Sequence, residues 1–138
     1  METENCPLVL LVEDNTADAN LIEEALAQSG LDAELLIVRD GAAAIELLHL
    51  VDSDDSYPSP DLVLLDLNLP KVSGEEVLKR IRLARRCANT KVLILSSSNA
   101  ASDRARAIEL GANAYFRKPS SLDHFMDLGP KVREMLQS

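Results

Sequence analysis

The sequence predicts an α/β fold in which helices cover both faces of a doubly wound, five-stranded parallel sheet. Short apolar runs alternate with helical patterns five times along the chain, which is typical of a parallel sheet built from strand–helix units. Several of these runs end in carboxylate or lysine residues. In open α/β sheets, ligands bind at the carboxyl ends of the strands, so the same pattern also predicts where a functional site lies.

The expected strands are short apolar runs. Aromatic residues make up only 3% of the chain, so the core must be built from Leu, Ile, Val and Ala. A polar, proline-punctuated loop is expected over Val51–Pro60. The strands are predicted at Leu8–Val12, Ala33–Val38, Leu62–Leu65, Lys91–Leu95 and Ala114–Phe116.

The expected helices follow from apolar spacing and from start and stop signals. Gly30 is a good stop for the first helix, and Ser73 with Glu76 forms a capping box at the start of the third. Gly129-Pro130 lies inside the last helix, where the proline is expected to cause a kink or a break. The helices are predicted at Thr16–Ser29, Gly41–Leu50, Ser73–Arg86, Ser102–Leu110 and Ser121–Leu136.

Size and charge restrict the class of protein. The 138 residues fit a single domain, expected to span 1–138 with a core over about 7–137. The net charge of -9 disfavours binding to nucleic acid or to anionic membranes. Cys6 and Cys87 lack metal-ligand spacing and are expected to be reduced thiols. With no signal peptide and no apolar run approaching ~18 residues, the chain is expected to be cytoplasmic.

Four strand ends carry the residues that indicate chemistry. Glu13 and Asp14 follow the first strand, Asp66 the third, Ser96 the fourth and Lys118 the fifth. Carboxylates at neighbouring strand ends repel one another unless a cation lies between them, and Mg²⁺ favours such oxygens together with a phosphate oxygen. A lysine and a hydroxyl suit a phosphoryl group. Each residue except Asp66 also fits a structural role on its own, as a helix cap or a surface lysine.

The basic run at the end of the third helix has two interpretations. Its cations either offset the helix dipole and solvate one face, which is the commoner case, or form a docking patch. The residues are Lys79, Arg80, Arg82, Arg85 and Arg86.

With these motifs the chain resembles the receiver domain of two-component response regulators, over essentially its full length. Asp66 to Ser96 is 96 − 66 = 30 residues and Ser96 to Lys118 is 118 − 96 = 22, spacings that suit this bacterial signalling family. The resemblance implies the flavodoxin-like strand order 2-1-3-4-5. Among single-domain receivers, the length of Val51–Pro60 and the run Asp-Leu-Asn-Leu-Pro at 66–70 look most like the phytochrome-associated kind.

The resemblance also implies roles for the site residues. Asp66 would be the phosphoacceptor. Mg²⁺ would be held by Glu13, Asp14 and Asp66, and by the backbone carbonyl of Asn68.

On the phosphoryl side, the resemblance assigns Ser96 and Lys118 as the groups that bind the phosphoryl oxygens. Tyr115 would be the switch aromatic, turning inward as Ser96 and its loop move toward the phosphate. The Lys118-Pro119 bond would be cis.

The function implied is that of a phosphorelay switch rather than an enzyme, although one that assists its own phosphorylation and dephosphorylation. A partner sensor histidine kinase would supply the phosphoryl group to Asp66. With no output domain expected after the last helix, output would pass to an unknown protein or through a homodimer. The homodimer would form on the fourth helix, fifth strand and fifth helix.

Three alternatives fit the sequence less well. The first is an interaction module that has the receiver fold but is never phosphorylated. A metal-dependent phosphatase would need an acid where Asn68 stands. A nucleotide-binding module would need a glycine-rich phosphate loop, which the sequence lacks.

Overall fold

A five-stranded parallel sheet forms the centre of the computed structural model, which describes residues 6–137. The strand order is β2-β1-β3-β4-β5 and all neighbours pair in parallel, which confirms the expected fold class and order. Each observed strand bound agrees with the sequence prediction to within one residue. The strands are β1 (Leu8–Val12), β2 (Glu34–Val38), β3 (Leu62–Asp66), β4 (Lys91–Ser96) and β5 (Ala114–Arg117).

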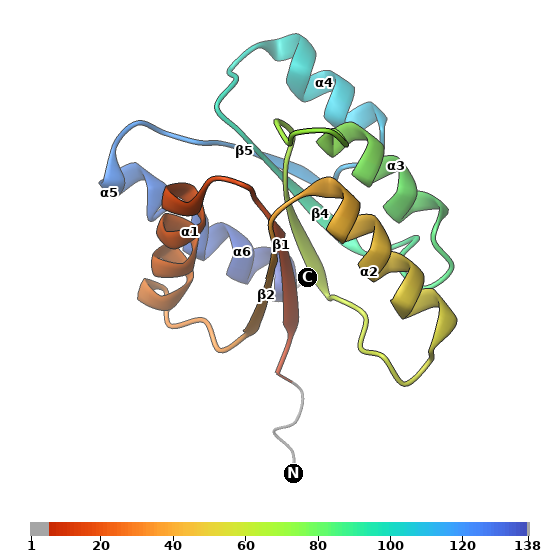
Figure 1. Ribbon diagram of the computed structural model, residues 1–138. Coiled ribbons are helices and arrows are strands. Elements are labelled where there is room, and N and C mark those ends of the chain that lie inside the picture. The colour runs from red at the N-terminus through yellow and green to blue at the C-terminus, as the bar shows by residue number, and fades with distance from the viewer. Residues whose placement is uncertain (1–5, 138) are drawn as a thin grey trace.

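Helices cover both faces of this sheet, as Figure 1 shows, with α1, α5 and α6 on one face and α2, α3 and α4 on the other. Alternate residues of β3 supply the two cores: Val63 packs toward α2 and α3, whereas Leu64 packs toward α1 and α6. Within residues 6–137, no helix has the length and apolarity to span a bilayer. The helices are α1 (Thr16–Gln28), α2 (Gly41–Ser53), α3 (Gly74–Leu83), α4 (Ala101–Glu109), α5 (Leu122–Phe125) and α6 (Leu128–Gln137).

Two helices end at places that the sequence did not indicate. Helix α2 continues to Ser53 because Val51, four residues after Leu47, is fully buried on the same face. Helix α3 ends at Leu83 rather than Arg86 because the Asp52 carboxylate accepts the N–H groups of residues 85 and 86, each at 2.9 Å. The backbone donors that would extend the helix are therefore bound to a side chain from α2.

Two arginines of the basic run, Arg82 in α3 and Arg86 after it, connect loops to this helix. The Nη1 of Arg86 donates to the carbonyl oxygens of Val51, Asp54 and Tyr57 at 2.6, 3.0 and 2.8 Å. Arg82 likewise donates to the carbonyl oxygens of Gly111 and Thr90. These two cations therefore connect loops, a role that neither interpretation of the basic run included.

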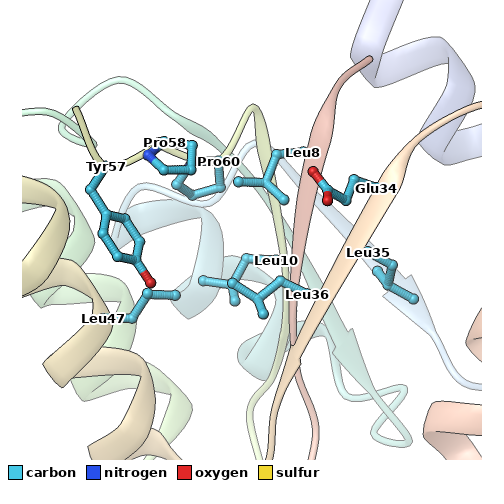
Figure 2. A pocket seen from close by; sticks show the side chains of 9 residues that line it. All are labelled: Leu8, Leu10, Glu34, Leu35, Leu36, Leu47, Tyr57, Pro58 and Pro60. Atoms are coloured by element: carbon cyan, nitrogen blue, oxygen red, sulfur yellow. The ribbon is translucent and has the colours of Figure 1, made fainter. Parts of the chain in front are cut away.

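The loop held by Arg86 forms one wall of a groove of about 310 Å³ beside the edge strand β2. Figure 2 shows the groove between β1 and β2 on one side and α2 with the loop on the other. Its walls are mostly apolar and include Leu8, Leu10, Leu36, Leu47, Tyr57 and Pro58.

The expected interruption of the last helix is confirmed, but it lies before the proline rather than at it. Helix α5 ends at Phe125 and α6 begins at Leu128, so Pro130 is the third residue of α6. A proline is tolerated in the first turn of a helix because the missing N–H would have no partner there. The carbonyl of Met126, which the proline ring would crowd in a continuous helix, instead accepts the Gly129 N–H at 3.2 Å.

Gly74, the first residue of α3, fixes how closely that helix approaches the end of β3. A Cβ on Gly74 would lie 2.6 Å from the Cα of Leu67 and would also overlap the backbone oxygen of Asp66. The Gly74 N–H donates to the carbonyl oxygen of Leu67 at 3.2 Å. The absence of a side chain therefore lets α3 pack directly against the residue that ends β3.

Gly74→Ala is expected to destabilise the protein by about 2–3 kcal/mol, because the added methyl group meets backbone atoms that cannot move aside without shifting α3. Urea unfolding monitored by circular dichroism measures the loss. Lys79→Ala on the exposed face of the same helix is the control and should change stability little. Equal stability of Gly74→Ala and the unmodified chain would contradict this account of the helix position.

Candidate functional site

The buried polar and charged residues of the described chain gather at the carboxyl ends of the strands. Glu13, Asp66 and Ser96 are 0%, 4% and 2% exposed, whereas the other buried side chains within residues 6–137 are hydrophobic. Glu13 follows β1, and Asp66 and Ser96 end β3 and β4. Burial of a carboxylate costs free energy unless partners compensate, so such a concentration indicates a functional site.

The register of the sheet brings these strand ends together. Val12 pairs with Leu65, which places Glu13 beside Asp66 at the ends of adjacent strands. Beyond β5, the N–H of Lys118 donates to the carbonyl oxygen of Ser96 at 2.7 Å, continuing the pairing with β4. The sheet therefore delivers the residues that the sequence identified to one edge.

Lys118 connects the carboxylates directly. Its Nζ donates to Glu13 Oε1 at 2.8 Å, to Asp18 Oδ2 at 2.8 Å and to Asp66 Oδ2 at 3.2 Å. The side chain of Lys118 is only 10% exposed. An ammonium group has three donors and no acceptor, so all of its hydrogen-bonding capacity is used.

The electrostatics of the cluster reflect an excess of negative charge. Burial, together with the neighbouring Asp66, raises the pKa of Glu13 to about 7, although Lys118 opposes the shift. For Lys118, burial alone would lower the pKa, but hydrogen bonds to Asp18 and Glu13 and the charge of Asp66 outweigh it and raise the pKa. Both raised pKa values favour the protonated forms of Glu13 and Lys118, and each bound proton lowers the net negative charge of the cluster.

Three of the acids can hold a metal ion. Glu13, Asp14 and Asp66 each offer one carboxylate oxygen, and these oxygens lie within 4.8 Å of one another. Asp14 is exposed to solvent, which leaves room for the waters that a hard divalent cation retains. All the ligand atoms are carboxylate oxygens, and Lys118 alone does not neutralise their negative charge. This set of ligands fits Mg²⁺ or a similar ion.

Ser96 and Asn68 border this cluster, and Ser96 contacts Lys118 through its backbone carbonyl oxygen. The Asn68 N–H donates to Asp66 Oδ1 at 2.9 Å, and the Asn68 side chain lies at an exposed position in the loop after β3. The hydroxyl oxygen of Ser96 accepts the Ser98 N–H at 3.1 Å, so it stabilises the turn that follows β4.

One expectation drawn from the resemblance differs from the structure, and another stays a prediction. The Lys118-Pro119 bond is trans, as are all peptide bonds among residues 6–137. A trans bond is the lower-energy form, and Lys118 reaches all three carboxylates with it. The inward turn of Tyr115 on phosphorylation stays a prediction: the residue is 6% exposed here, and its hydroxyl donates to the Ser98 carbonyl oxygen at 3.0 Å. Arg104 lies 5.7 Å from the ring centroid.

Two further residues belong to this site and were not predicted from the sequence. Asp18, in the first turn of α1, contacts Lys118, and Arg39, just after β2, donates to the carbonyl oxygen of Asp14 at 3.2 Å and to the Thr16 hydroxyl. Asp18 stands four residues after Asp14, a spacing that could have drawn attention to it. Nothing in the sequence marks Arg39 as a site residue, because the strand that it follows does not end in one of the predicted acidic site residues.

Comparisons with known proteins agree with this geometry. The model of the response regulator receiver domain family matches residues 9–128. Response regulator Rcp1 of a Synechocystis strain is 41% identical over 115 residues, which cover 83% of this chain and 78% of Rcp1.

Solved structures give the same result. The phosphorylated cyanobacterial phytochrome response regulator RcpA superposes with a TM-score of 0.84 at 37% identity, covering 96% of this chain and 95% of RcpA. The Mn²⁺-bound form of Rcp1 superposes with a TM-score of 0.81 at 37% identity, covering 93% and 92% of the two chains. The resemblance seen in the sequence is confirmed, and the chain belongs to the response regulator receiver domain family.

Proposed function

We propose that the protein is a phosphorylation-controlled signalling switch that accepts a phosphoryl group on Asp66 from a sensor histidine kinase in a Mg²⁺-dependent reaction. The observation that carries the proposal is the position of Asp66. It is buried at the end of β3, hydrogen-bonded to Lys118, and close enough to Glu13 and Asp14 to share a cation. Rcp1 and RcpA, which are a Mn²⁺-bound and a phosphorylated regulator, support both halves of the proposal.

The chemistry follows from these residues. A carboxylate oxygen of Asp66 forms a bond to phosphorus while the bond between phosphorus and the kinase imidazole nitrogen breaks. The electron pair of that bond returns to the imidazole nitrogen, which takes a proton from water. Lys118 donates to the oxygens of the transferring group and lowers the energy of their charge. Mg²⁺, when bound by Glu13, Asp14, Asp66 and the backbone carbonyl of Asn68, would supply further positive charge to the same oxygens.

The contacts of Ser96 and Tyr115 suggest how the protein would change conformation when Asp66 carries a phosphoryl group. The Ser96 hydroxyl oxygen accepts the Ser98 N–H, and its O–H can still donate to a phosphoryl oxygen. A turn of this side chain toward the phosphoryl group would therefore move the loop that begins at Ser98. Tyr115 contacts that loop through its hydroxyl, so the two movements are coupled. We propose that the inward position of Tyr115 is one of two states and that the phosphoryl group shifts their populations.

Asp66→Asn should take up no phosphoryl group from an acyl-phosphate donor in the presence of Mg²⁺, because an amide cannot act as the nucleophile. Intact-protein mass spectrometry measures the added phosphoryl mass. Asp123→Asn, at an exposed position in the first turn of α5, is the control and should label like the unmodified chain.

Two outcomes would contradict the assignment. Full labelling of Asp66→Asn would place the phosphoryl group on another residue. If the unmodified chain takes no label from either the small donor or a phytochrome-type kinase, it is a receiver-shaped interaction module instead.

For output, we propose self-association through the face formed by α4, β5 and α5. Three apolar residues next to this face, Phe125, Leu128 and Val132, are buried in the core. The apolar side chains that it exposes are instead Ile108 and Leu122, at 45% and 57% exposure.

Ile108→Ser should weaken any dimer that forms when a phosphoryl mimic and Mg²⁺ are added, because it removes apolar area from this face. Sedimentation velocity with and without the mimic measures the change in mass. Leu83→Ser, which alters an 81% exposed side chain on α3, is the matched control. If the mass is the same in every state and variant, this face does not mediate self-association.

A further inference from the structure

Asp18 supplies a third carboxylate to Lys118, one that stands outside the cluster of acids able to hold a cation. Its Oδ2 accepts a hydrogen bond from Lys118 Nζ at 2.8 Å, the same length as the bond to Glu13 and shorter than the 3.2 Å bond to Asp66. Glu13 and Asp66 belong to the group whose oxygens lie within 4.8 Å of one another, and Asp18 does not. Lys118 is therefore shared between the cation site and a separate acid.

The position of Asp18 is fixed by the start of α1. Its backbone N–H donates to the Asn15 side chain at 2.9 Å, which is the cap of that helix. A carboxylate in the first turn of a helix is also stabilised by the helix dipole. The side chain is 28% exposed, so it is partly shielded from solvent beside the 10% exposed Lys118. Asp18 is thus a firmly placed acceptor rather than a mobile surface acid.

Lys118 cannot serve a phosphoryl group without giving up a present partner. Its three donors are already occupied by Glu13, Asp18 and Asp66. A bound divalent cation would neutralise charge on Glu13 and Asp66, and so weaken their attraction for the ammonium group. The cation would not neutralise the charge of Asp18, which lies outside the cation site. Asp18 would therefore be the acid that competes most strongly with the phosphoryl oxygens for Lys118.

We infer that Asp18 is a positioning residue that competes with the phosphoryl oxygens for Lys118 and thereby restrains phosphorylation of Asp66. The inference rests on the proposed function. Removing the charge of Asp18 frees the ammonium group for the transferring oxygens, and it also removes a negative charge near the incoming phosphoryl group. Both effects favour the phosphorylated state.

Asp18→Asn tests the inference because the amide keeps the size of the side chain and an oxygen acceptor but removes the charge. At saturating Mg²⁺, the second-order rate of phosphorylation by an acyl-phosphate donor should rise by about 3- to 10-fold, the size expected when one hydrogen bond that holds Lys118 is weakened. The affinity for a fluoroberyllate phosphoryl mimic, titrated by tyrosine fluorescence, should rise by a similar factor. A residue that only stabilised the fold would give no increase in either quantity.

Three control variants isolate the contact. Asp18→Glu keeps the charge and should restore slow phosphorylation. Glu23→Gln removes one negative charge from an exposed position on the same helix and should leave the rate unchanged. In a Lys118→Gln background, Asp18→Asn should lose most of its effect, because coupling between the two substitutions reveals that Asp18 acts through Lys118.

The outcomes separate this inference from the proposed function. An unmodified chain that takes up no phosphoryl group refutes the proposed function, and the inference with it. If the unmodified chain is phosphorylated and Asp18→Asn reacts at the same rate or more slowly, the inference alone is wrong. An equal gain with Lys118→Gln present would show that Asp18 acts only through space on the phosphoryl group, which also overturns its role as a competitor for Lys118.

Discussion

Lys118 has to balance an excess of negative charge at the carboxyl ends of the strands. Its ammonium group contacts Glu13, Asp18 and Asp66, and Asp14 lies beside the same cluster. One positive charge cannot satisfy four carboxylates, and burial together with the neighbouring Asp66 raises the pKa of Glu13. The site can therefore bind a divalent cation. Without that cation, the repulsion among its carboxylates lowers the stability of the folded protein.

The rest of the fold allows this cluster to exist. Strands β1, β3 and β4 are apolar on both faces, so helices bury them and water is excluded from all but their carboxyl ends. Gly74 lets α3 approach the end of β3, and the bond from the Lys118 N–H to the Ser96 carbonyl oxygen extends the β4–β5 pairing to the lysine. Backbone contacts of this kind hold the charged side chains within hydrogen-bonding distance.

The sheet and most site residues could be predicted because they depend on local signals. An apolar run that ends in Asp66 specifies a buried strand and a site at once. The features that could not be predicted depend on partners distant in sequence. Asp18 meets Lys118 across 100 residues, and α3 ends early because Asp52 accepts N–H groups from residues more than 30 positions later. The effect of Pro130 was foreseen, but the break moved to the preceding turn, where the proline fits the start of a new helix.

The most direct test of this charge imbalance is the free energy of unfolding from pH 5 to pH 8, measured in EDTA and in saturating Mg²⁺. Because folding raises the pKa of Glu13 from 4.5 to about 7, the folded state binds more protons in this range, so stability in EDTA should fall as pH rises. The stabilisation by Mg²⁺ should grow over the same range, since the cation replaces that proton, and Asp14→Ala should lose most of it. Stabilisation by Mg²⁺ that is absent, or that does not change between pH 5 and pH 8, would contradict the account.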